Sequence, residues 1–74
     1  MTTHEAESAL RTEVYDLVQI LQQKADEAVR YRTFAGDARA AGDQELSTWF
    51  EELAAADDRI VARARELARA RVHG

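Results

Sequence analysis

The sequence contains no cysteine and no proline, and its only glycines are Gly36, Gly42 and Gly74. Without cysteine, disulfide bonds and thiolate metal sites are excluded. Without proline and with so little glycine, few positions interrupt a helix. No run of alternating Val, Ile and Thr is present, so no strand is predicted. Alanine occurs 15 times, and most of the remainder is Glu, Gln, Arg and Leu, all of which favour helix.

Long apolar runs are also missing. No stretch approaches the roughly 20 apolar residues that a membrane span requires, and residues 1–10 lack the basic and apolar parts of a signal peptide. We therefore expect a cytoplasmic protein with no membrane contact. A chain of 74 residues is expected to form a single domain, 1–74, which is too small to bury a large core alone.

Charge is unevenly distributed within the net value of −4. Residues 1–58 carry five basic and thirteen acidic side chains, whereas residues 59–74 carry five arginines against Glu66 alone. A basic end can indicate a nucleic-acid partner. It also suits the C-terminus of a helix that returns beside the acidic start of the chain. The second interpretation is favoured, and no nucleic-acid partner is expected.

Apolar residues separated by steps of three and four predict two helices. The first, over residues 3–41, carries the stripe Leu10, Val14, Leu17, Leu21, Ala25, Ala28, Tyr31, Ala35 and Ala38, widened by Ile20 and Phe34. The second, over residues 44–71, carries Leu46, Phe50, Leu53, Asp57, Ile60, Ala64 and Leu67, with Trp49 beside Phe50.

The triplet Ala-Gly-Asp occurs twice, at Gly36 and at Gly42, and either could form the turn. The apolar stripe continues through Ala35 and Ala38, so the turn is predicted at residues 42–43. Gly36 then lies inside a helix at a cost of about 1 kcal/mol relative to Ala. A neighbouring helix that approached closely at Gly36 would offset this cost.

An isolated hairpin would leave one side of each stripe in water. Burial of a large apolar side chain contributes about 1.5–3 kcal/mol, so a partner surface is strongly favoured. The predicted fold class is all-α: an antiparallel two-helix hairpin that dimerises into a four-helix bundle. The side chains expected in its core and dimer contact are Leu17, Leu21, Phe34, Phe50, Leu53 and Leu67.

Two carboxylates break the apolar pattern. Asp57 occupies a stripe position, and Glu27 lies seven residues after Ile20 and seven before Phe34. Both lie about fifteen residues from the turn, so the hairpin brings them to one level. A buried carboxylate is costly unless it is paired or bound to a metal. Three other interpretations remain: Asp57 lies one position off the stripe, Glu27 pairs with Lys24, Arg30 or Arg32, or the carboxylates set register and partner choice.

At these positions the chain resembles the rubrerythrin and ferritin-like superfamily, most of all the small encapsulin-associated ferritins. The resemblance covers roughly residues 10–70 and rests on Glu27-Ala28-Val29, Tyr31, Gly42-Asp43, Glu45-Leu46, and Asp57 with Ile60 three residues later. Two-helix chains of that family dimerise to build one di-iron site from a Glu and a Glu-x-x-His pair. The resemblance implies metal ligands at Glu27 and Asp57, and a site lined by Tyr31 and Ile60.

Ile60 stands where that family has its histidine, and isoleucine cannot coordinate a metal. We therefore expect a dimeric interaction or assembly module with a degenerate di-iron site rather than an enzyme. Its expected partners are a second copy of the chain or a further protein. The alternative is a carboxylate-bridged protein that binds iron or another divalent cation, with ferroxidase-type activity.

Overall fold

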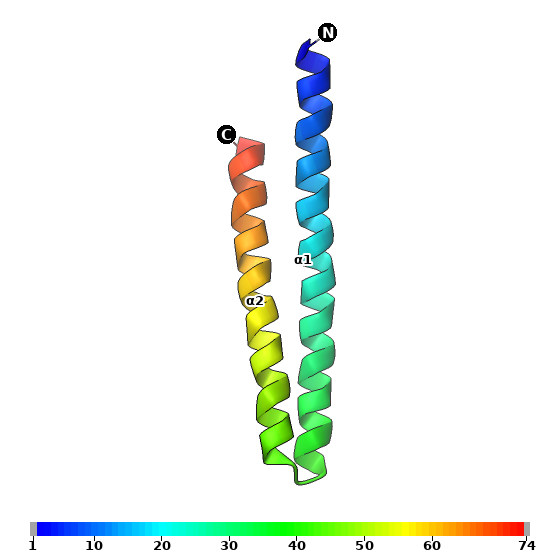
Figure 1. The fold of residues 1–74 in the computed structure, drawn as a ribbon, viewed down its shortest axis with the longest axis vertical. Helices are drawn as coiled ribbons and strands as arrows, with labels where there is room; N and C mark the ends of the chain where they lie inside the picture. Colours follow the sequence, from blue (N-terminus) through cyan, green and yellow to red (C-terminus); the bar gives the residue numbers. More distant parts are fainter. Residues whose placement is uncertain (1, 74) are drawn as a thin grey trace.

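The computed structural model describes residues 2–73, and the side chains of residues 11–72. Two helices, α1 (Thr2–Ala40) and α2 (Gln44–His73), run antiparallel as a hairpin (Figure 1). No strand is present in this part of the chain. The predicted helical hairpin is confirmed, and the helix ends differ from 3–41 and 44–71 by one or two residues.

The turn is built from Gly42 and Asp43. Gly42 has a φ of +79°, the left-handed conformation that glycine adopts without steric cost. Its N–H donates to the carbonyl of Arg39 (3.0 Å), and the N–H of Asp43 donates to the carbonyl of Ala38 (2.9 Å). These two bonds form a Schellman motif that satisfies the last carbonyls of α1.

Asp43 also starts the next helix. Its Oδ1 accepts a hydrogen bond from the N–H of Leu46 at 3.1 Å, and its carbonyl accepts one from the N–H of Ser47 at 3.1 Å. Asp43 is therefore the N-cap of α2. One residue closes α1 and opens α2, which explains why the turn is so short.

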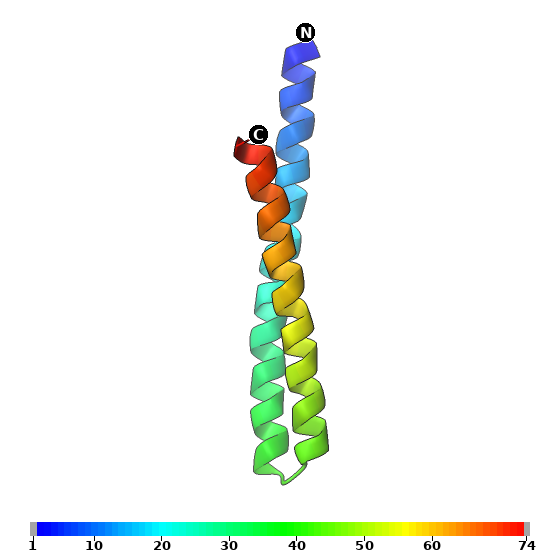
Figure 2. The same ribbon diagram turned by 90° about the vertical axis from the view of Figure 1, so that its left-hand side faces the viewer.

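The hairpin is a thin rod. Its principal extents are 62 × 15 × 12 Å, and its radius of gyration is 17.3 Å, whereas a compact domain of this length would have about 11 Å. The helices cross at a shallow angle (Figure 2), and the N-terminal part of α1 extends beyond the end of α2 (Figure 1). Each helix therefore contacts the other along a single line, and most of the surface of both helices remains exposed.

That line of contact is a regular seam with a seven-residue repeat. All its side chains are buried or half-buried. On α1 they are Val14, Leu17, Leu21, Lys24, Ala28, Tyr31, Ala35 and Ala38, and on α2 they are Ser47, Phe50, Ala54, Asp57, Val61, Ala64 and Ala68.

The fully buried apolar side chains among residues 11–72 are all alanines: Ala28, Ala35, Ala38, Ala54 and Ala64. Small side chains allow the two backbones to approach closely. Ser47 is fully buried with them, and its Oγ donates to the carbonyl of Ala35 on the other helix at 2.9 Å. The seam is narrow, and no large side chain is completely enclosed in it.

The predicted stripe of α2 was displaced by one residue along most of its length. The predicted stripe contains Leu46, Leu53, Ile60 and Leu67, whereas the residues that pack on α1 are their neighbours Ser47, Ala54, Val61 and Ala68. Large residues were favoured over small ones as seam residues, whereas the close helix contact selects the small ones. On α1, Lys24 rather than Ala25 occupies the seam, because it continues the seven-residue repeat through Leu17 and Tyr31.

No close helix approach occurs at Gly36 within the hairpin. A Cβ at this position would meet no atom within 4 Å, so no neighbouring element of the hairpin requires glycine there. Gly36 lies on the open side of α1, one position after the buried Ala35.

Candidate functional site

The hairpin brings together the two carboxylates predicted to lie at one level, and Lys24 lies between them. Lys24 Nζ is 3.2 Å from Glu27 Oε1 on the same helix and 3.9 Å from Asp57 Oδ1 on α2. Lys24 and Glu27 are about one-third exposed, whereas Asp57 is only 5% exposed. We call Lys24, Glu27 and Asp57 the central polar cluster.

Within this cluster, Asp57 is the residue whose burial as a charged carboxylate destabilises the folded state most. Its Oδ2 is buried and accepts no hydrogen bond from the described residues. Burial raises the pKa of Asp57, and the adjacent Glu27 raises it further. Hydrogen bonding with Asp57, followed by that with Lys24, lowers the pKa of Glu27. A proton on Asp57 would allow this carboxyl to donate to the Glu27 carboxylate, so the pair is suited to sharing one proton.

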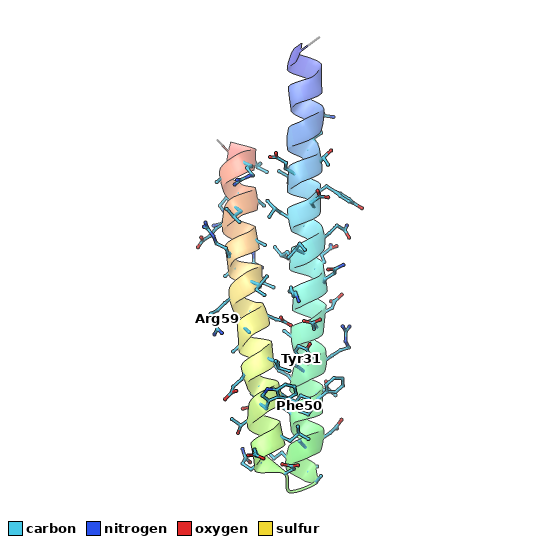
Figure 3. The ribbon with its side chains drawn as sticks, viewed as in Figure 1. Tyr31, Phe50 and Arg59 are labelled. Carbon is cyan, nitrogen blue, oxygen red and sulfur yellow. The ribbon has the colours of Figure 1, made fainter. Side chains whose placement is uncertain are left out.

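Two neighbours respond to the same charges. The hydrogen bond to Glu27, and then its charge, raise the pKa of Lys24, so its ammonium remains protonated at neutral pH. Burial raises the pKa of Tyr31, and the charge of Glu27 adds to the effect. Tyr31 thus lies beside the carboxylates, on the seam near Phe50 (Figure 3).

The residues of one hairpin do not fit a ferritin-type iron site. No group of three or more His, Asp or Glu side chains suitable for a metal occurs among the described residues. Ile60, which the resemblance sets at a histidine position, is 40% exposed and lies on the side of α2 rather than on its seam. The ammonium of Lys24 already supplies a positive charge to both carboxylates.

One flank of the hairpin is apolar. Six large side chains that lie outside the seam gather along it and are half-buried to exposed. We call this surface the apolar face, and it consists of Ile20 and Phe34 on α1 with Leu46, Leu53, Ile60 and Leu67 on α2. Shallow grooves on it join the two helices: Leu17, Ile20 and Leu67 line one, and Phe34, Leu46 and Phe50 line another.

The opposite flank is ionic. Arg32 forms an ion pair with Asp58, and Arg39 forms one with Glu51 at 2.6 Å, both between the helices. All four side chains are about half exposed, so each pair contributes little to stability. Their position nevertheless shows that the hairpin has one charged flank and one apolar flank.

An aromatic cluster connects the seam with the apolar face near the turn. The ring of Phe34 lies 6.2 Å from Tyr31 and 5.5 Å from Phe50 in edge-to-face geometry, and Trp49 lies 5.6 Å from Phe50. Such pairs add about 0.5–1.5 kcal/mol beyond the burial of their area. Trp49 nevertheless keeps 52% of its surface exposed.

The six side chains predicted for the core and dimer contact divide into two groups. Leu17, Leu21 and Phe50 are half-buried on the seam. Leu53 and Leu67 are half-buried on the apolar face, and Phe34 is 41% exposed there. None of the six is fully buried in the hairpin, because alanine and serine take the enclosed positions.

Sequence analysis did not identify Lys24 and Ser47 as seam residues. Lys24 was considered only as one of three partners for Glu27, and the structure selects it over Arg30 and Arg32. The seven-residue spacing of Lys24 from Tyr31 and from Leu17 was the available signal for Lys24. For Ser47 the signal was its place three residues before Phe50 and seven before Ala54.

Comparison of the chain with protein-family models, with curated proteins and with solved structures found no match. The resemblance to ferritin-like proteins therefore rests on the sequence pattern described above. Neither helix within residues 2–73 combines the length and the apolar character that crossing a bilayer requires.

Proposed function

We propose that this protein is a dimeric helical-hairpin module that acts through association with its own kind, in the form of a ferritin-like four-helix bundle without a working di-iron site. The observation that carries the proposal is the apolar face. Six large side chains lie along one flank, while the enclosed apolar positions of the seam hold only alanine. A continuous apolar band on a small protein marks an interaction surface.

The energetics of the hairpin support this proposal. A seam of alanines removes little apolar area from water, and a chain this small has a marginal core in any case. The 62 × 15 Å outline of the hairpin is of the order of the roughly 800 Å² per partner that a stable interface buries. Association therefore supplies the core that the isolated chain lacks.

Sedimentation equilibrium with two matched variants tests the proposal. Ile60→Glu places a charge in the middle of the apolar face, and Val29→Glu places the same charge on the outer side of α1, where Val29 is 64% exposed. We expect the unchanged chain and Val29→Glu to be dimers at micromolar concentration, and Ile60→Glu to be monomeric or unfolded. A folded monomer of the unchanged chain would contradict the proposal.

A second candidate function, binding of a divalent cation, is favoured by one observation. Asp57 Oδ2 is buried beside Glu27 and has no hydrogen-bond partner among the described residues. A dimer would gather four carboxylates, from two copies of Glu27 and Asp57. An all-oxygen ligand set of this kind suits hard cations such as Mg²⁺ and Ca²⁺, whereas a ferritin-type iron site also uses histidine.

The presence of Lys24 decides how to test this second function. Titration of the protein with Mg²⁺, Ca²⁺ or Fe²⁺ should raise the thermal midpoint if the carboxylates bind the cation, because a ligand of the folded state stabilises it. Lys24→Met should strengthen the effect by removing the competing ammonium. Unchanged midpoints for both proteins, with no metal retained after dialysis, would eliminate the function.

A further inference from the structure

Helix α2 carries a second seam with the same seven-residue repeat as the first. It begins one residue earlier and contains Leu46, Trp49, Leu53, Ala56, Ile60, Arg63, Leu67 and Ala70. Leu53, Ala56 and Leu67 are half-buried and the other five are exposed, so α1 covers this side of α2 only in part. Five of the eight residues are large and apolar. A helix with two such seams is built to contact two helical neighbours. The hairpin supplies only the first of them.

Charge along the hairpin indicates how the second neighbour is oriented. The half nearest the turn, residues 27–58, has eight acidic and three basic side chains. The open half, residues 11–26 and 59–72, has four acidic and seven basic side chains. This separation of charge is strongest on α2. Residues 44–58 carry five acidic side chains and no basic one, and residues 59–72 carry five arginines and one acidic side chain.

A second copy is therefore attracted most strongly when the two turns lie at opposite ends. This arrangement places the acidic half of each α2 along the basic half of the other. With both turns at the same end, acid would lie on acid and base on base. Opposite charges along an interface favour the first arrangement and disfavour the second.

From these features we infer that two copies associate through antiparallel contact of their α2 helices along the second seam, around a two-fold axis at the level of residues 27 and 58. This inference rests on the proposed dimer and adds its geometry. The partner is a second copy of this chain, recognised by the apolar face and the polarity of α2.

The sizes of the side chains agree with an axis at this level. Centring the antiparallel seam on residue 58 sets Ala56 opposite the partner's Ile60 and Leu46 opposite the partner's Ala70, a large residue against a small one in both pairs, and it sets Trp49 opposite the partner's Leu67. Leu53 then faces the aliphatic stem of the partner's Arg63. The guanidinium of that arginine lies within reach of Glu52, beside Leu53.

Helix α1 gives the same level independently. The turn is centred between Gly42 and Asp43, so residue 58 on α2 stands opposite Glu27 on α1. Ile20 and Phe34 lie seven residues on either side of Glu27. An axis at Glu27 therefore sets Ile20 of each copy opposite the partner's Phe34, and the residues of the apolar face on both helices are covered in one operation.

The same axis brings the two central polar clusters together. Two copies of Glu27 and Asp57 contribute four carboxyl groups, and two copies of Lys24 and Arg30 contribute four cations; Arg30 lines a surface hollow with Lys24 and Glu27. Asp26 lines the same hollow, so groups of both signs are present at the centre. Such a polar layer fixes the register of an otherwise apolar interface.

Distance measurement between two spin labels tests the inference on the full chain. A single label at Gln44→Cys, an exposed position beside the turn, should lie about 42 Å along the bundle from its copy, since 28 residues of helix separate them around this axis. Turns at the same end would give only the width of the bundle, about 20 Å. The long distance supports the inference, and the short one overturns it while leaving the dimer intact.

The same experiment separates failure of the geometry from failure of the proposed function. Absence of dipolar coupling at high micromolar concentration would mean that no dimer forms, and it would overturn both. Introducing Ile60→Glu into the labelled chain should abolish the coupling. Labelled Val29→Glu is the matched control and should retain the long distance.

Disulfide trapping gives a second, independent measurement. Ala56→Cys mixed with Ile60→Cys should form a mixed disulfide-linked dimer faster than either variant links to itself. Phe34→Cys mixed with Leu53→Cys, which face one another only if both turns lie at the same end, should link slowly. Faster linking of the second pair than of the first would overturn the inference.

Discussion

Lys24 Nζ lies 3.9 Å from Asp57 Oδ1 across the hairpin, and this contact joins the middle of α1 to the middle of α2 through a seam that is otherwise made largely of alanine. Lys24 is also bound to Glu27 at 3.2 Å. The ammonium therefore compensates two carboxylates, one of them buried.

Lys24→Met should destabilise the hairpin at neutral pH, because it leaves Glu27 and Asp57 adjacent without a positive charge. It should also raise the pKa of Asp57 further, since the charge of Lys24 opposes the effect of burial. Chemical denaturation at pH 7 and pH 4 measures both effects. Lys24→Arg is the control and should retain most of the stability; equal losses in the two variants would show that the charge is unimportant.

Asp57→Asn should stabilise the protein by about 1 kcal/mol at pH 7, because an ionised carboxylate in a buried position is replaced by a neutral group of similar size. The pKa of Asp57 is raised, so its contribution to stability is greatest below its ordinary pKa and is lost as the pH rises through its folded value. Glu27 has the opposite sign: its pKa is lowered, and its contribution is lost as the pH falls.

The free energy of unfolding of the unchanged chain should therefore fall as the pH rises from mildly acidic to neutral, because Asp57 loses its proton in this range. In Asp57→Asn this fall should disappear, whereas the loss at lower pH from Glu27 should remain. Thermal unfolding between pH 3 and pH 8 provides the comparison. A steeper fall toward neutral pH in Asp57→Asn than in the unchanged chain would show that Asp57 is not the group responsible.

Ala54→Leu should destabilise the hairpin by about 1–3 kcal/mol, because the seam has no space for a larger side chain where the helices meet. Ala62→Leu on the exposed side of α2 is the matched control and should change stability by less than about 0.5 kcal/mol. Urea denaturation distinguishes the two. Comparable effects would mean that the close alanine contact does not determine the packing.

The two internal glycines should respond in opposite ways to alanine. Gly42→Ala should cost about 1 kcal/mol, since alanine resists the positive φ of the Schellman turn. Gly36→Ala should stabilise the protein by a similar amount, because Gly36 is helical and a Cβ there meets open space. Destabilisation by Gly36→Ala would point to a contact that a single hairpin lacks.

Added salt should weaken the dimer if its α2 helices pair acid to base. Raising the ionic strength from about 0.01 M to 0.15 M shortens the screening length from roughly 30 to 8 Å. The dissociation constant from sedimentation should therefore increase. A dissociation constant that falls with salt would indicate that like charges face one another and that the turns lie at the same end.

The hairpin, its turn at Gly42 and the alignment of Glu27 with Asp57 could all be predicted from the sequence. Periodicity and glycine chemistry act locally, and the level of two residues follows from their distance to the turn. The identity of the seam on α2 could not be predicted in the same way. Two overlapping repeats, one through Leu53 and Ile60 and one through Ala54 and Val61, are both apolar, and hydrophobicity favours the first.

Close helix contact reverses that choice, because small side chains permit it and large ones prevent it. The same preference left Lys24 out of the predicted seam, although its long aliphatic stem can pack there while its ammonium reaches Glu27 and Asp57. The carboxylates were therefore predicted at the correct level, but the cation between them was only one of several alternatives.

The two seams of α2 share no residue. The residues that pack α2 against α1 are therefore distinct from those that we propose contact the second copy. Exchanging the acidic residues and arginines that border the second seam could create variants that bind each other but not the unchanged chain. The alanines of the first seam would stay the same. After gene duplication, two copies of such a protein could therefore acquire different binding partners and keep the same hairpin fold.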